Sequence, residues 1–248
     1  MLLTHKKEKP KISVSSRIAP NAVICGDVTI GSNCSIGFGC VLVAESGPIF
    51  IGDNCIVMDT AVLRGVRDAS LTIGNNVLIG PRAYLSGCSI EDDVFLATAV
   101  FNKARVGKGS EVRVNGLVHL RTVLPPHSMV PIGWVAVGDP ATILPSSEHD
   151  QIWSIQKPLD FPRVVFGVDR PPPGETMMPN VMPRYGRSLH SHQTDEVLWN
   201  QCKGMVQIHV SSWVQFVSLG STSCLPVFGI RTAGGRPYLA EIFSISFV

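Results

Sequence analysis

The stretch from Ile51 to Val100, IGDNCIVMDTAVLRGVRDASLTIGNNVLIGPRAYLSGCSIEDDVFLATAV, decides the fold of this chain. When it is divided into sixes, an aliphatic residue keeps returning, usually followed by glycine or an acid and, four places later, by a small residue. The clearest copies begin at Ile51, Ile73 and Ile90 and read IGDNCI, IGNNVL and IEDDVF. A short fixed period marks a solenoid, whose units cannot bury their apolar face alone and must stack on their neighbours.

A period of six favours a β-solenoid over the simpler patterns. An amphipathic helix repeats its apolar residues at three and four, and a half-buried strand alternates at two. Each hexad instead fits a short strand and a turn, with the aliphatic residue inside and Gly, Asn or Asp in the turn, where positive φ costs little. The sequence therefore predicts an all-β solenoid, a parallel β-helix of hexapeptide repeats. A sandwich of short strands is the alternative, but its strands would not keep a constant phase.

The repeat also predicts the domain organisation. It begins at Ile18, slips in phase at Leu42 to Phe50 and again at Gly65 to Ser70, and ends with a coil at Leu124 to Val130. Phase slips predict loops at solenoid corners, where binding sites are often built. We expect an N-terminal arm over residues 1–11, the β-helix over 12–145, a short helix over 146–157 with Ser147 as N-cap, and a proline-rich arm with an irregular tail over 158–248.

The C-terminal third departs from the repeat. Residues Lys157 to Leu189 are dense in proline, which predicts that this segment is not helical. An extended arm wrapping a neighbouring subunit and a disordered linker fit this composition equally well. His190 and His192 have a spacing that metal ligands use, but a lone H-x-H pair does not by itself predict a metal site. The last fifty or so residues are apolar without hexads, and short β-like runs are expected within them.

Composition and charge exclude several classes of protein. The chain has 248 residues, 45% of them hydrophobic, and a net charge of +2. This near-neutral balance argues against a nucleic-acid-binding protein, which needs a concentrated basic face. No apolar run approaches the roughly 20 residues of a membrane span, and the first residues lack the apolar core of a secretory signal. We therefore expect a cytoplasmic protein without a membrane partner.

The seven cysteines do not form a disulfide or zinc pattern. Cys34, Cys40 and Cys55 occupy the small-residue position of the hexad and are predicted to be buried thiols in the coil interior. The odd count and the absence of any CxxC pair fit a reducing compartment.

The chain from about Ile12 to Leu144 resembles the left-handed β-helix of the hexapeptide-repeat superfamily. LPPHSMV and VGDPATIL resemble the closing coil shared by its acyltransferases and the gamma-class carbonic anhydrases. LTIGNNVLIGPRAYLSGCSIEDDVFLATAV resembles the gamma class across its central coils. This resemblance implies three hexads per turn, a homotrimer, and metal sites at the subunit interfaces.

The resemblance also supplies a test of activity. Active gamma-class members hold zinc with three histidines, and matching MDTAVLRG, IGPRAYL and SGC onto that pattern places Arg64, Pro81 and Ser86 at the three positions. Arginine stays cationic, proline has no ligand atom, and serine is a poor zinc donor. We therefore predict a degenerate metal site, no bound metal and no carbonic anhydrase activity.

Other parts of the family's site are only partly retained. The resemblance places Met58 where the family has an acid–base glutamine, and leaves Glu45 as the one acid in the earlier coil. Asp59 and the Gly87-Cys88 pair remain. A metal site rebuilt elsewhere would draw on Cys88, His119 or Glu45.

A cleft for a small anion is a second prediction from these positions. Glu45, Asp59, Arg64, Arg82 and Cys88 are candidate residues for it, and Arg67 could add a further positive charge for a carboxylate or phosphate. The alternatives are solvated or inter-subunit ion-paired arginines and, for Cys88, a buried inert thiol.

Two histidines lie near the closing coil. Superfamily acyltransferases use a histidine at the groove between coils to deprotonate the acceptor, and His119 is the candidate for that role here. His127, in the LPPHSMV turn, is expected to be an exposed structural residue.

Two functions from different classes follow. The first is a metal-free, gamma-carbonic-anhydrase-like homotrimer that acts as a scaffold or binds a small carboxylate or an acyl carrier, with no cofactor. The alternative is a coenzyme A-dependent acyltransferase that uses acyl-CoA, with His119 as general base. Whether the chain is an enzyme stays open, and acyl transfer is favoured over hydration of carbon dioxide.

Overall fold

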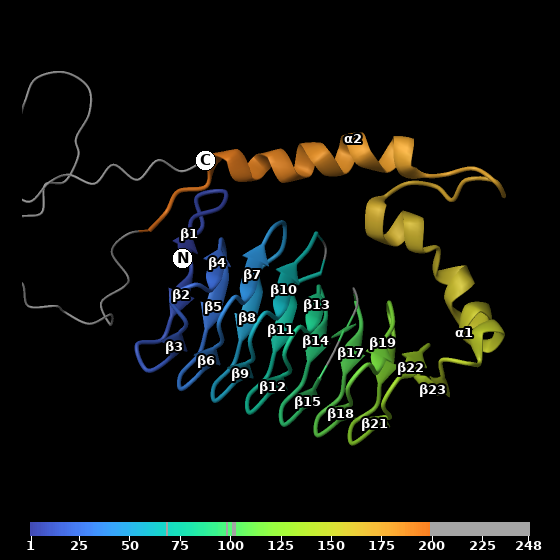
Figure 1. Cartoon of the computed structure of the whole chain (residues 1–248), viewed down its shortest axis with the longest axis horizontal. Coiled ribbons are helices and arrows are strands. Elements are labelled where there is room, and N and C mark those ends of the chain that lie inside the picture. Colours follow the sequence, from blue (N-terminus) through green and yellow to red (C-terminus); the bar gives the residue numbers. More distant parts are fainter. Residues whose placement is uncertain (68, 98, 101–102, 199–248) are drawn as a thin grey trace, which may run out of the picture. The chain divides into compact units, whose positions relative to one another are not determined.

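Every third strand of the chain pairs in parallel with the strand one coil earlier, so that three sheets form the sides of a coil (Figure 1). The computed structural model describes residues 1–198 except 68, 98, 101 and 102. The predicted β-like runs of the last fifty residues lie outside these described residues. The architecture confirms the prediction of a left-handed parallel β-helix.

In the described part of the chain, the first sheet has nine strands: β1 (Leu2–Leu3), β4 (Val23–Cys25), β7 (Val41–Ala44), β10 (Val62–Gly65), β13 (Tyr84–Ser86), β16 (Ala99–Val100), β19 (Leu117–Val118), β22 (Trp134–Val137) and β23 (Thr142–Pro145). The last of these pairs antiparallel with β22 and ends the solenoid.

The second and third sheets have seven described strands each. The second contains β2 (Lys11–Ile12), β5 (Val28–Ile30), β8 (Ile49–Ile51), β11 (Leu71–Ile73), β14 (Ser89–Ile90), β17 (Arg105–Val106) and β20 (Val123–Leu124). The third contains β3 (Arg17–Ile18), β6 (Ser35–Ile36), β9 (Ile56–Val57), β12 (Leu78–Ile79), β15 (Phe95–Leu96), β18 (Glu111–Val112) and β21 (Met129–Val130).

The hexad aliphatic residues and the predicted thiols fill the interior. Leu42, Leu63 and Leu85 occupy the same register position on β7, β10 and β13, and each is fully buried. The buried free thiols of Cys34, Cys40 and Cys55 confirm the prediction made from their place in the hexad. The core is therefore a set of stacked side-chain ladders, each residue packed between its counterparts one coil away.

The turns have the left-handed backbone that the sequence predicted. Asn33, Asn54 and Asn76 have φ of 56° each at the same corner of successive coils. Their side-chain amides form a ladder, with Nδ2 of Asn33 donating to Oδ1 of Asn54 at 3.4 Å and Nδ2 of Asn54 to Oδ1 of Asn76 at 3.3 Å. Asparagine tolerates this conformation better than most residues, which explains its recurrence there.

The two phase slips form loops that lie on each other. Ser46 donates its backbone N–H to the carbonyl of Gly65 at 3.2 Å, and Val66 and Ala69 form an antiparallel bridge within the second loop. The two loops project from the corner that follows β7 and β10.

The ends of the solenoid differ from expectation. β1 pairs with β4, so the segment expected as an N-terminal arm contributes the first strand of a sheet. At the other end α1 (His149–Gln156) lies within the expected short helix, but its N-cap is Glu148, which makes no side-chain capping bond. The choice of Ser147 as N-cap was therefore wrong by one residue.

The proline-rich segment is partly helical, which corrects the prediction that it is not. It contains the short helical turns η1 (Lys157–Leu159) and η2 (Pro162–Phe166) and the helix α2 (Met178–Leu189), and the turn η3 (His190–Thr194) follows it. A proline occupies the first turn of α2, where no N–H partner is needed, and only Pro183 lies inside the helix. Val181, 1% exposed, anchors the helix. We call residues 157–198 the C-terminal arm.

No helix in the described part of the chain is long and apolar enough to cross a membrane.

Candidate ligand-binding site

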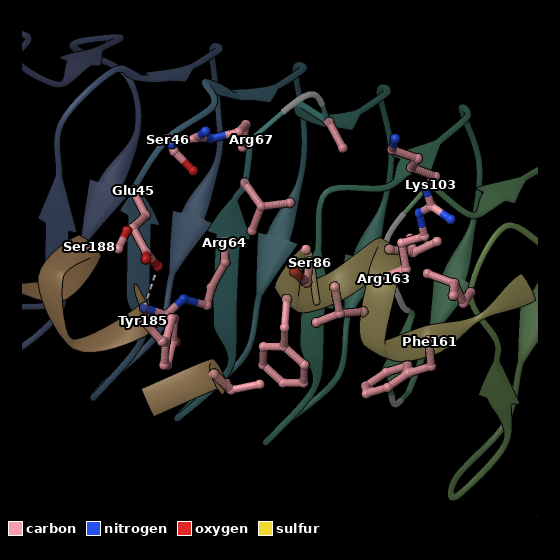
Figure 2. A pocket seen from close by; sticks show the side chains of 18 of the residues that line it. Glu45, Ser46, Arg64, Arg67, Ser86, Lys103, Phe161, Arg163, Tyr185 and Ser188 are labelled. Atoms are coloured by element: carbon pink, nitrogen blue, oxygen red, sulfur yellow. Dashed lines mark hydrogen bonds and ion pairs between the residues drawn. The ribbon is translucent and has the colours of Figure 1, made fainter. Parts of the chain in front are cut away.

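A pocket of about 820 Å³ lies between the outer face of the first sheet and the C-terminal arm (Figure 2). Residues of the loop after β7, of β10 and the loop after it, and of β13 line one side. Side chains of η2 and α2 line the other. Both phase-slip loops thus contribute to the pocket, as the sequence predicted for solenoid corners.

An ion pair lies at one end of the pocket. Arg64 donates from Nη2 to Oε2 of Glu45 at 2.8 Å, and the side chains are 26% and 8% exposed respectively. Figure 2 shows the two side chains pointing toward one another, with Tyr185 of α2 beside them. Arg64 is also the register partner of Ser86 on β13, which is buried and lines the same pocket. Two of the three degenerate positions are therefore neighbours.

The charge of the pocket is strongly positive. The cationic residues that line it are Arg64, Arg67, Lys103, Arg163 and Arg184. Glu45 is the one carboxylate among the described lining residues, and Arg64 already binds it. Among the residues the structure describes, no carboxylate forms an ion pair with the other four cations. Arg184 donates to the backbone carbonyl of Gly167 at 2.8 Å.

Within one chain, the other predicted cleft residues lie away from this pocket. Asp59 and Arg82 occupy stacked turns at another corner, where Arg82 donates its N–H to the carbonyl of Asp59 at 3.1 Å. Oδ1 of Asp59 accepts the N–H of Phe38 at 2.7 Å. Pro81 is exposed beside Arg82. The predicted cleft is therefore divided, with Glu45 and Arg64 in the pocket and the remaining polar residues at a turn.

Cys88 is a core residue rather than a ligand of the pocket. It is 2% exposed and belongs to the hydrophobic core. Burial raises the pKa of its thiol to about 12, and hydrogen bonds to backbone groups oppose this only in part. A thiol that stays protonated is a poor nucleophile, so the structure favours the inert alternative.

The residues at the degenerate positions do not fit zinc. The guanidinium of Arg64 offers no lone pair and repels a cation, and it forms an ion pair with Glu45. Pro81 supplies no ligand atom from its turn. The side chains of Arg64 and Pro81 therefore offer no donor atom to a zinc ion.

The two histidines near the closing coil differ in environment. His119 is half-buried, and burial lowers the pKa of its imidazole while a backbone hydrogen bond at Leu120 raises it in part. His119 does not line the pocket, although its neighbour Leu120 does. His127 is exposed with φ of 58° at a turn, where the sequence placed it.

Sequence reasoning missed the contribution of the C-terminal arm. Arg163 and Arg184 add positive charge, and Phe161, Phe166 and Tyr185 add an aromatic wall with ring centroids 5.8 and 6.4 Å apart in successive pairs. Arginines and aromatic residues interspersed among prolines were the available signal. Their position over the first sheet depends on tertiary contacts, which that pattern does not encode.

Two family models of hexapeptide repeats match parts of the solenoid. The family model described as bacterial transferase hexapeptide (six repeats) matches residues 11–44, and that described as hexapeptide repeat of succinyl-transferase matches residues 70–101. A putative acetyltransferase structure from Bacillus cereus is 27% identical, with a TM-score of 0.49, over 62% of this chain and 90% of that one.

Curated relatives include gamma carbonic anhydrases. The mitochondrial gamma carbonic anhydrase 1 of Arabidopsis thaliana is 30% identical over 150 residues, which cover 58% of this chain and 53% of the relative. A carbonic anhydrase of Geobacillus kaustophilus is 26% identical over 159 residues, 63% of this chain and 84% of the relative. The chain spans about half the length of the Arabidopsis gamma carbonic anhydrases 1 and 2 that it matches. The chain therefore matches hexapeptide-repeat family models over two parts of its coil and is similar to the gamma-class carbonic anhydrases.

Proposed function

We propose that this protein is a cytoplasmic, gamma-carbonic-anhydrase-like homotrimer that lacks carbonic anhydrase activity and binds a small organic anion, a carboxylate or a phosphate ester, in the pocket beside Glu45 and Arg64. The observation that carries the proposal is the charge of this pocket, where five cations face one carboxylate. Zinc-dependent hydration of carbon dioxide by the purified protein would contradict it.

The arginine side chains suit an anion. A guanidinium presents a planar fork of donors that matches carboxylate and phosphate oxygens, and such charge-assisted bonds are among the stronger ones in proteins. A pocket of about 820 Å³ is within the usual range for small-molecule sites. Phe161 and Phe166 supply apolar surface in the same pocket. The expected ligand therefore has an anionic head and an apolar part.

Titration calorimetry with three probes tests this proposal. The probes are hexanoate, inorganic pyrophosphate and acetyl-CoA, added to the full chain at constant ionic strength. Replacing Arg163 or Arg67 by glutamine is expected to lower the affinity for the probe that binds by about tenfold or more. The reason is that a lost charge-assisted hydrogen bond costs about 1.5–3 kcal/mol of binding free energy. Arg105→Gln is the matched control, since Arg105 is exposed on the second sheet. Failure of all three probes to bind, or equal losses in the control, contradicts the proposal.

An apolar row on the third sheet supports the proposed trimer. Ile56, Leu78 and Phe95 are register partners on β9, β12 and β15, and Ile56 and Phe95 are 46% and 40% exposed. Exposed apolar rows of this kind favour association between subunits.

Light scattering on the full chain checks the trimer. The mass is expected to be about three times the chain's 26.7 kDa. Ile56→Glu places a charge in the apolar row and is expected to lower this mass, whereas Val14→Glu, at a fully exposed position elsewhere, is not. A monomeric mass for the unaltered protein would rule out the trimer.

Acyl transfer from acyl-CoA is the second candidate. Burial lowers the pKa of His119, so its imidazole is neutral at pH 7 and can accept the proton of an acceptor hydroxyl or amine. The acceptor oxygen or nitrogen would then form the new acyl bond as the thioester breaks and the coenzyme A thiolate leaves. Two results together would favour this candidate. Acetyl-CoA would be the one probe of the three that binds, and its turnover would fall about 100-fold in His119→Asn. Acetyl-CoA binding without turnover would leave the protein a binder of anions.

A further inference from the structure

Four side chains with metal-binding atoms meet at the N-terminal end of the solenoid, away from the pocket cations. They are His5, Cys25, His192 and Asp195, and one donor atom of each lies within 4.8 Å of the others. His5 is in the turn after β1 and Cys25 ends β4, whereas His192 is in η3 and Asp195 follows it. Residues about 190 positions apart in the sequence thus share one site.

The carboxylate of Asp195 lies at the centre of this cluster. Its Oδ1 is 2.7 Å from Nδ1 of His5, and its Oδ2 is 2.7 Å from Nδ1 of His192. The thiol of Cys25 donates to Oδ2 at 3.2 Å. The two imidazole rings stack, with centroids 4.1 Å apart. His5 and Cys25 are buried, and the side chains of Asp195 and His192 are 9% and 26% exposed.

The hydrogen bonds of His5 determine which of its nitrogens can bind a metal. Nε2 of His5 lies 3.1 Å from the backbone carbonyl of Glu45, which only accepts, so Nε2 carries a proton. In neutral His5 the lone pair of Nδ1 then faces the Asp195 carboxylate, and two acceptors meet at 2.7 Å. A histidine that donates one N–H to a backbone carbonyl and presents the other nitrogen is the usual arrangement at a metal.

We propose that His5, Cys25, His192 and Asp195 bind one divalent transition-metal ion of the zinc type. Two imidazoles, a thiolate and a carboxylate suit zinc, whereas magnesium and calcium prefer oxygen ligands alone. Tetrahedral zinc, with bonds of about 2.0–2.3 Å, holds its ligand atoms roughly 3.3–3.7 Å apart. The widest donor pairs, at up to 4.8 Å, must therefore close by about an ångström, and the contacts of Asp195 with the two imidazoles, at 2.7 Å, must open to admit the ion.

Such an ion would fasten the C-terminal arm to the first coil. Backbone hydrogen bonds already join the two segments, from Thr4 N–H to the carbonyl of Glu196 at 2.9 Å and from Leu198 N–H to that of Leu2 at 2.8 Å. Four protein ligands leave no open position, which is typical of a structural site rather than a catalytic one. The carbonyl of Glu45 that faces His5 also accepts from Nζ of Lys6, and the carboxylate of the same residue binds Arg64 in the pocket.

Protons compete with the ion at this site. Burial, and then the hydrogen bond and charge of Asp195, raises the pKa of Cys25 to about 12, so the thiol keeps its proton at neutral pH without metal. Burial by itself raises the pKa of Asp195, but hydrogen bonds from His192, His5 and Cys25 outweigh it and lower that pKa. The carboxylate is ready to bind, whereas the thiol must release a proton. Metal affinity is therefore expected to rise with pH.

Cobalt substitution in the full chain tests the proposal. Chelator-treated protein is titrated with Co²⁺, whose thiolate complexes give a charge-transfer absorption in the near ultraviolet, and Zn²⁺ is then added as competitor. One Co²⁺ per chain with this absorption is expected, together with displacement by Zn²⁺. Cys25→Ser is expected to abolish the absorption, and His192→Gln to weaken Co²⁺ binding at least tenfold. Cys34→Ser and His190→Gln, a buried thiol and an exposed histidine outside the cluster, are the matched controls.

Thermal unfolding separates loss of the site from loss of the fold. The metal-free His192→Gln protein is expected to melt close to the metal-free parent, because its side chain is at the edge of the cluster, and to lose the stabilisation that Zn²⁺ gives the parent. If the protein binds no Co²⁺ at millimolar concentrations of the ion, the proposal is overturned. A charge-transfer absorption that survives Cys25→Ser also overturns it, because the metal would then bind another cysteine. Neither result bears on the anion pocket, whose residues are unchanged in these variants.

Discussion

Replacing Leu85 by alanine is expected to lower the free energy of unfolding by about 2–5 kcal/mol. Leu85 is fully buried, and its register partners on the first sheet are Leu63 on one side and Val100 on the other. Its loss leaves a cavity beside Leu63 in the core, and the stacked backbone closes this cavity poorly because each coil is held by hydrogen bonds to the next. Equilibrium unfolding in urea, followed by circular dichroism, measures the change.

The same side-chain deletion at an exposed position provides the control. Leu189, at the end of α2, is 39% exposed, and Leu189→Ala is expected to change the free energy of unfolding by no more than about 0.5 kcal/mol. A cost below about 1 kcal/mol for Leu85→Ala would mean that the ladder relaxes around the cavity, contrary to the close packing inferred here.

Replacing Gly65 by alanine is expected to cost about 1–3 kcal/mol and to weaken ligand binding in the pocket. A Cβ at position 65 would lie 2.0 Å from the carbonyl oxygen of Gly47 and 2.9 Å from that of Pro48. Both atoms belong to the backbone, so no side-chain rotation relieves the clash and the two phase-slip loops must separate. Glu45 and Arg64 are in or beside these loops, and their ion pair would change with them. Urea unfolding and the calorimetric titration together measure both effects.

Gly186→Ala is the matched control with the opposite sign. Gly186 is inside α2, where nothing lies within 4 Å of the added Cβ. Alanine favours a helix over glycine by about 0.5–1 kcal/mol, so this variant is expected to be stabilised. Gly65→Ala protein that binds the probe and unfolds like its parent would show that the loops are not held against each other.

Much of the fold could be predicted because its information is local. The hexad of IGNNVL fixes which residue points inward, which sits in the turn, and where the next strand begins. Each coil then pairs with a neighbour only 15 to 22 residues away, as in the register pairs Leu85–Val100 and Leu2–Ile24. The buried thiols and the left-handed asparagine turns follow from the same pattern. The helical part of the C-terminal arm could not be predicted from this pattern. Prolines in the first turn of a helix and at one interior position are tolerated when tertiary contacts, such as those of buried Val181, stabilise the helix.

Some residues of the candidate sites could be predicted from the repeat, and others are brought together only by tertiary contacts. The sequence by itself determined the solenoid, because the repeat is local. Its resemblance to the gamma class predicts that Arg64 and Ser86 replace metal ligands and that Glu45 is the acid of the earlier coil, and the first of these stays a prediction. Only the tertiary structure decided that Arg163 of the arm completes the pocket and that His5 meets Asp195 across nearly the whole described chain. A repeat specifies contacts between adjacent coils, whereas an arm finds its place through contacts with many coils at once, and no short pattern in a sequence records those.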